Sequence, residues 1–178
     1  MMTRDIVFRK VPELNDITHA EMREKCADTL LEALRLGGWS SFEMLEETPY
    51  LENGKPGPGR IEFIREVAAL AADEYDELIE WIDEMAPCDR DTILAAALLS
   101  DIGVYVTKGP RPPENADLYN KTEWAGYLAQ KNGLPGKVVY ILLTLDPVMA
   151  PEGSKAVLVN ELRFVRSSYF TLLSALIS

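Results

Sequence analysis

The chain has 178 residues, of which 47% are hydrophobic and 26% charged, a size and balance typical of one globular domain. Its formal net charge of −11 is uneven, because residues 1–89 carry 9 Lys and Arg against 21 Asp and Glu, and residues 90–178 carry 9 against 8. The acidic half argues against nucleic-acid binding, and the lack of a signal peptide or of about 20 consecutive apolar residues predicts a cytoplasmic protein without membrane contact.

The first predicted helix follows Thr18. Thr18 and Glu21 have the spacing of a capping box, and apolar residues then recur with helical spacing. Gly37-Gly38 is expected to end this helix. Residues 47–59 are rich in Gly and Pro and are predicted to form a loop.

Two further helices are predicted between residues 60 and 107. One runs from about Arg60 to Met85, with an apolar stripe made of Ile61, Ile64, Val67, Ala68, Ala71, Tyr75, Leu78 and Ile82. The next begins near Asp89 or Asp91, where a carboxylate can cap free amides, and Gly103 is expected to interrupt it. Because residues 93–99 are apolar on every face, this helix should be central in the core.

The last third of the chain continues the helical pattern. After a loop over residues 108–118, Asn120 and Glu123 are predicted to cap a fourth helix. Pro135 can begin a fifth, which should stop before Asp146-Pro147, and residues 152–177 are predicted to form a last apolar helix. No segment has convincing strand alternation, so the predicted fold class is all-α, with about six helices in a single domain.

Few side chains of the chain are suited to metal or redox chemistry. Its only histidine, His19, lies at the start of the first predicted helix and is expected on the helix surface. Cys26 and Cys88 stand in no metal-binding spacing, and we expect two free thiols.

Four segments, taken in order, resemble the signature of HD-domain phosphohydrolases. The run 89–103, which ends in Ser100-Asp101-Ile102-Gly103, is similar to the buried helix of that family that ends in a His-Asp pair and Ile-Gly-Lys. Residues 60–68, 121–129 and 133–142 resemble its flanking helices. The resemblance covers roughly residues 58–146. It implies an all-α, HD-domain-like core over residues 58–178, preceded by a helix and loop extension over residues 1–57.

The resemblance also implies that the metal site of that family has been lost. Where the family has metal-binding histidines, this chain has Phe63, Ser100, Lys121 and, near the end of the fifth helix, Leu145-Asp146. Phe has no lone pair to offer, Ser is a poor ligand, and a charged Lys has no acceptor. Asp101 alone remains of the central pair. Phe63, Ser100, Asp101, Lys121 and Asp146 would then line a vestigial pocket without metal or catalytic residues.

Two alternatives keep chemistry in this pocket. Asp101, Asp146 and Glu161 could converge on Mg²⁺ or Mn²⁺ in a divergent phosphohydrolase that acts on a nucleotide or phosphate ester. Alternatively, cationic side chains could take the place of the metal and hold an anion without hydrolysing it; the candidate anion-binding residues are Arg60, Lys121, Arg163 and Arg166. The simpler interpretation of the first is that Asp101 is a helix-end carboxylate bonded to backbone amides, Arg60 or Lys121. For the second, it is that a buried Lys or Arg pairs with Asp101.

The sequence therefore favours a catalytically silent HD-fold protein, without a cofactor, that binds a small anionic ligand or a protein partner. A structural subunit that docks a basic partner through its acidic first half is a further alternative. The apolar stretch 168–177 could pack on the first helix or form the seam of a homodimer.

Overall fold

The computed structural model describes residues 2–49, 58–81 and 89–145 and is all-helical over these ranges. The elements are α1 (Arg4–Lys10), η1 (Pro12–Asp16), α2 (Ala20–Leu36), α3 (Phe42–Glu47), α4 (Arg60–Trp81), α5 (Arg90–Leu99), α6 (Ile102–Thr107), η2 (Ala116–Leu118), α7 (Lys121–Lys131) and α8 (Gly136–Thr144). Here η marks a 3₁₀ helix. The predicted all-α class is confirmed, and no helix in these ranges is long and apolar enough to cross a bilayer.

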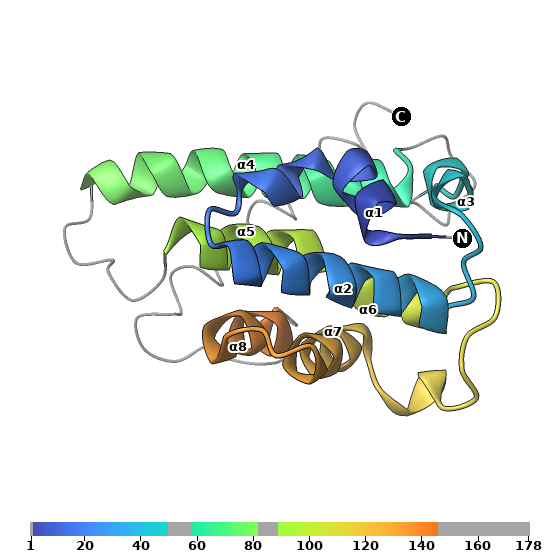
Figure 1. Cartoon of the computed structure of the whole chain (residues 1–178). Coiled ribbons are helices and arrows are strands. Elements are labelled where there is room, and N and C mark those ends of the chain that lie inside the picture. Colours follow the sequence, from blue (N-terminus) through green and yellow to red (C-terminus); the bar gives the residue numbers. More distant parts are fainter. Residues whose placement is uncertain (1, 50–57, 82–88, 146–178) are drawn as a thin grey trace, which may run out of the picture.

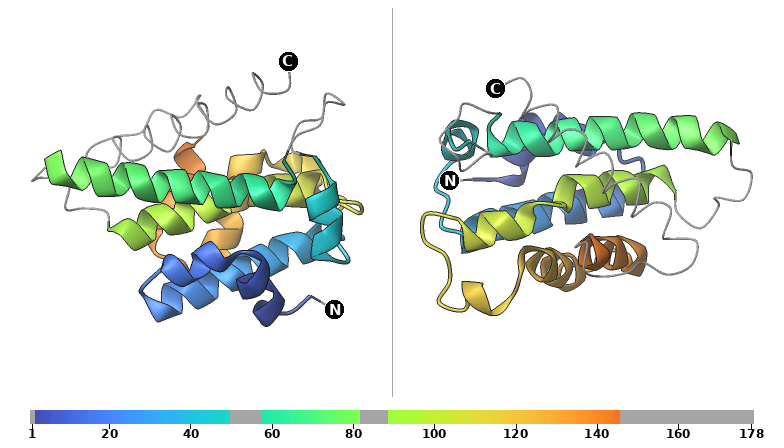
Figure 2. Two further views of the ribbon diagram at one scale, coloured as in Figure 1. Left: turned by 90° about the horizontal axis from the view of Figure 1, so that it is seen from above. Right: turned by 180° about the vertical axis from the view of Figure 1, so that it is seen from behind.

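The helices lie in three layers (Figure 1). The long helix α4 forms one outer layer and the pair α7–α8 the other, while α2, α5 and α6 lie between them. Seen from behind, α5 and α6 lie end to end along α2 (Figure 2). Helix α5 contacts α4, α2 and α8, and every residue from Asp91 to Leu99 is buried, which confirms its predicted central place.

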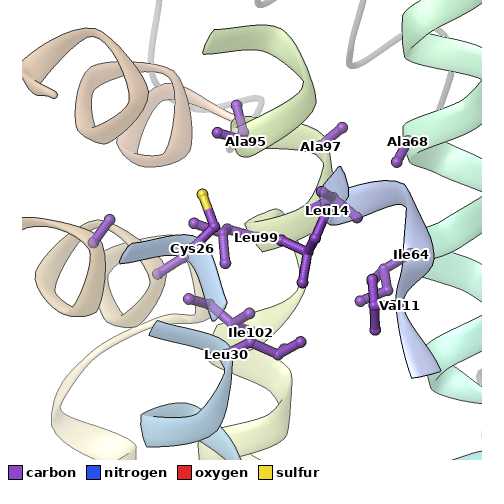
Figure 3. Packing of buried hydrophobic residues seen from close by; sticks show 14 of the residues in the cluster. Val11, Leu14, Cys26, Leu30, Ile64, Ala68, Ala95, Ala97, Leu99 and Ile102 are labelled. Carbon is purple, nitrogen blue, oxygen red and sulfur yellow. The ribbon is translucent and has the colours of Figure 1, made fainter. Parts of the chain in front are cut away.

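One hydrophobic cluster joins these layers. In Figure 3, Val11 and Ile64 lie on the side of α4, Cys26, Leu30 and Ile102 lie on the side of α2, and Leu14 and Leu99 lie between these two groups. Because α2 packs against α5, α6 and α7, the segment predicted as an N-terminal extension contributes to the same core as the segment after residue 58. The described part of the predicted stripe on α4, from Ile61 to Tyr75, is buried as expected. Leu78 and Ile82 belong to the part of that stripe whose side chains are not described.

The predicted start of α2 is wrong in detail. His19, not Thr18, is the N-cap, and its Nδ1 accepts a hydrogen bond from the amide of Met22 at 3.3 Å. Thr18 donates instead to Asp91, from its amide at 2.9 Å and its hydroxyl at 2.8 Å. Glu21 pairs with Lys25 at 2.6 Å. A carboxylate from α5 therefore accepts from the Thr18 amide, which in a local capping box would have donated to Glu21, and also from the Thr18 hydroxyl.

The helix break predicted at Gly103 occurs two residues earlier, at Asp101. Helix α5 ends at Leu99, and Asp101 turns the chain with φ −114° and ψ 3° before α6 begins at Ile102. Gly103 lies within α6, where a Cβ atom would come 1.8 Å from the carbonyl oxygen of Lys121. A glycine is required at position 103 because α6 approaches α7 closely there, and not because a helix ends there.

Candidate functional site

The turn between α5 and α6 carries the central pair of the predicted pocket. Ser100 retains 1% of its surface and Asp101 none, so both polar side chains lie in the interior. Both take part in interactions with their surroundings. A buried carboxylate is tolerated when it is paired or hydrogen-bonded. The interactions of Asp101 are therefore consistent with a structural role for this residue.

The start of α4 supplies two more of the predicted residues. Phe63 is 1% exposed and belongs to the hydrophobic cluster, and Arg60 is 4% exposed. The hydroxyl of Tyr105 in α6 donates to the carbonyl oxygen of Arg60 at 3.0 Å. This bond attaches α6 to the first turn of α4 and places the turn containing Asp101 in the same part of the fold. Tyr105 was missed by sequence reasoning, because an aromatic residue in an apolar helix carries no sign of its partner.

Lys121 does not enter this interior. It is the first residue of α7, its side chain is exposed, and its backbone lies close to α6 at Gly103. An exposed Lys121 does not support the alternative in which this residue points into the old metal cavity. The predicted capping box of Asn120 and Glu123 is confirmed, and it fixes the first turn of α7 with the Lys121 side chain on the outside.

The donor set that the structure describes does not fit the metal site of HD-domain proteins. Phe63 offers no ligand atom, and Lys121 faces solvent. Within the described ranges, no three His, Cys, Asp or Glu side chains are grouped to hold an ion. Asp146, Glu161, Arg163 and Arg166 lie outside the described residues, so the carboxylate trio and most of the alternative anion site stay predictions.

Two cavities lie elsewhere on the described surface, and neither is lined by Phe63, Ser100 or Asp101. One, of about 350 Å³, carries both signs of charge, from Glu21 and Asp89 and from Lys25 and Lys137. The other, of about 400 Å³, lies at the C-terminal end of α2 and contains Arg35 and Arg111. Sequence reasoning missed this pair, although the Gly37-Gly38 turn and the Pro-flanked Arg111 were visible signals of a fixed loop.

Two groups between α2 and α5 have shifted pKa values. Burial raises the pKa of Asp91, but hydrogen bonds from the amides of Thr18 and His19 and from the Thr18 hydroxyl outweigh it, so that the pKa lies below its ordinary value. Burial, with a smaller effect of the Asp91 charge, raises the pKa of the Cys26 thiol to about 12. Cys26 is a free thiol, as predicted, and Cys88 lies outside the described residues.

Comparison of the chain with protein-family models, with curated proteins and with solved structures finds no match in any of the three. The HD-domain resemblance therefore rests on the four sequence segments alone.

Proposed function

We propose that this chain is a catalytically silent, HD-like helical protein that acts as a binding or regulatory module for a small anionic ligand or a protein partner. One observation carries the proposal. At two positions where the HD-domain resemblance implies metal ligands, Phe63 is packed into the hydrophobic cluster and Lys121 is exposed to solvent. Metal-dependent hydrolysis needs ligands that converge on a cation and leave room for water and substrate.

The buried Asp101 is compatible with a second candidate function, metal-dependent hydrolysis. A divergent phosphohydrolase would use this carboxylate with Asp146 and Glu161 to hold Mg²⁺ or Mn²⁺. Such an enzyme needs several ligands close to one ion. Asp146 and Glu161 lie outside the described residues, and within those residues no three His, Cys, Asp or Glu side chains are grouped to hold an ion.

The two functions are separated by metal content and turnover. The full-length protein would be purified, incubated with Mn²⁺ or Mg²⁺, passed through a desalting column, and assayed for bound metal and for hydrolysis of p-nitrophenyl phosphate and nucleoside triphosphates. We expect substoichiometric metal and no turnover above that of Asp101→Asn. Asp117→Asn, an exposed change of the same type, is the matched control.

The proposal would be refuted if the protein retained stoichiometric metal and showed turnover. That turnover would have to persist in Asp117→Asn and disappear in Asp101→Asn. Circular dichroism of both variants shows whether a lost activity reflects a lost fold.

A further inference from the structure

The cavity at the C-terminal end of α2 brings two arginines together. Arg35 comes from the last turn of α2 and Arg111 from the loop after α6, 76 positions later in the sequence. Apolar side chains of Met2, Leu31 and Trp39 line the same cavity. The site thus combines two guanidinium groups with an apolar wall.

Backbone contacts hold the two arginine-bearing segments in place. The amide of Arg111 donates to the carbonyl oxygen of Gly37 at 2.9 Å. A Cβ atom on Gly109 would come 2.1 Å from that same oxygen, and one on Gly38 would come 2.6 Å from the Cβ of Arg111. Gly38 also has a φ of 75°, which favours glycine. Only glycines at these positions allow the two segments to approach so closely.

The sequence around Arg111 restricts its backbone further. Pro110 precedes it and Pro112 follows it, so the loop has few alternative conformations to lose when a ligand binds. A preorganised site binds more tightly than a flexible one with the same groups.

Within the described residues, the two arginines of this cavity are not neutralised by a neighbouring carboxylate, unlike three other arginines of the described surface. Arg4, Arg65 and Arg90 each pair with a carboxylate, at 2.7 to 3.0 Å. No described carboxylate lies within 4.0 Å of the guanidinium of Arg35 or Arg111, although the chain carries a net charge of −11. Glu32 is close enough to Arg35 to be influenced by its charge, but its carboxylate is engaged by Lys131 and Asn132.

The end of α2 offers little opposition to an anion. Helix C-termini repel negative charge through their free carbonyl groups. Here the carbonyl oxygens of Ala33 and Leu34 accept from the amides of Gly37 and Trp39 at 3.0 Å, and Arg111 binds the oxygen of Gly37. These bonds leave less partial negative charge facing the cavity.

The apolar wall is also fixed. The indole N–H of Trp39 donates to the carbonyl oxygen of Tyr105 at 2.8 Å, which orients the ring. The volume of about 400 Å³ suits a small molecule. From this combination we infer that the cavity binds a small phosphate monoester, with the phosphate between Arg35 and Arg111 and an apolar group beside Trp39 and Leu31. Guanidinium groups match phosphate oxygens in bidentate geometry, and two of them balance a dianion.

This inference deepens the proposed binding function and rests on it for the anionic class of ligand. It is tested by titration calorimetry at low salt and pH 8, with phenyl phosphate and inorganic phosphate as probes. The variants are Arg35→Gln and Arg111→Gln, and Arg9→Gln on the exposed face of α1 is a control with the same change in charge. We expect saturable binding of phenyl phosphate, weaker binding of inorganic phosphate, and about tenfold loss in either cavity variant. Arg9→Gln should change the affinity by less than about twofold.

Absence of saturable phenyl phosphate binding at millimolar concentration would overturn the inference. Equal losses in Arg9→Gln and in the cavity variants would also overturn it, because binding would then follow net charge. Equal affinities for the two probes would refute the contribution of the apolar wall. The outcome of the metal and turnover assay does not depend on any of these results. Failure of phosphate monoester binding at this cavity is therefore distinguishable from failure of the proposed function.

Discussion

Asp91 shows how one carboxylate links two helices. The sequence left Asp89 and Asp91 as alternative caps of the third predicted helix, and the structure assigns the cap to Asp89, which accepts from the amide of Thr92 at 2.8 Å. Asp91, in the first turn of α5, receives three hydrogen bonds from Thr18 and His19 at the start of α2. Its depressed pKa is the electrostatic consequence of those donors.

Asp91→Asn is expected to lower the free energy of unfolding by about 2 kcal/mol at pH 7, because Asn has a single acceptor oxygen in place of a charged pair. A depressed folded-state pKa gives stability that is present above the unfolded pKa of about 3.9 and is lost as pH falls through the folded value. The difference between wild type and variant, measured by urea denaturation from pH 7 to pH 2, should therefore shrink below about pH 4.

Asp73→Asn, on the exposed face of α4, serves as the control and should leave stability unchanged at every pH. A gap between wild type and Asp91→Asn that stays constant down to pH 2 would contradict a role for the Asp91 charge.

At the scale of elements, the junction of α6 and α7 depends on the absence of one side chain. Gly103 allows the α6 backbone to lie against the carbonyl of Lys121, directly at the first turn of α7. The capping box of Asn120 and Glu123 holds that turn from the other side. The position of α7, and with it the outward direction of Lys121, is fixed by these two features together.

Gly103→Ala is expected to destabilise the protein by roughly 3 kcal/mol, because a backbone carbonyl, unlike a flexible side chain, cannot move aside for the new methyl group. Gly136→Ala is the matched control. It lies in the first turn of α8 with no atom within 4 Å of the added Cβ, and it should be neutral or stabilise by about 0.5 kcal/mol. Thermal and urea denaturation measure both, and a Gly103→Ala protein as stable as wild type would refute the close contact.

At the scale of the whole molecule, Cys26 reports on the integrity of the core. Its side chain is fully buried in the cluster shared by α2, α5 and their neighbours, and its pKa is raised to about 12 by burial and by the Asp91 charge. A thiol in this state is neither accessible nor ionised at neutral pH.

In a Cys88→Ser background, iodoacetamide at pH 8 should modify Cys26 only as fast as the protein unfolds, and the rate should rise with urea through the unfolding transition. Ser40→Cys, combined with Cys26→Ala and Cys88→Ser, places a thiol at an exposed position and should react without denaturant. Rapid alkylation of native Cys26 would mean that the core opens without global unfolding. Mass spectrometry measures both rates.

The sequence by itself determined the helical class, the central place of α5, the buried stripe of α4 and the capped start of α7. Each of these depends on local periodicity or on a cap within one turn, which a sequence displays directly. The interpretation of Phe63, Ser100 and Lys121 as replacements of metal-binding residues depends on the resemblance and stays a prediction. The short helices α1 and α3 were not expected, because six or seven residues carry too little periodicity to stand out.

Only the tertiary structure decided where polar groups find their partners. Thr18 bonds to Asp91 across two helices, Tyr105 reaches the backbone of Arg60, and Lys121 turns outward, none of which spacing along the chain can reveal. The Arg35 and Arg111 cavity depends on glycine contacts between segments far apart in sequence. Such pairings are set by packing over long sequence separations, where a side chain bonds to whichever group the fold brings near it.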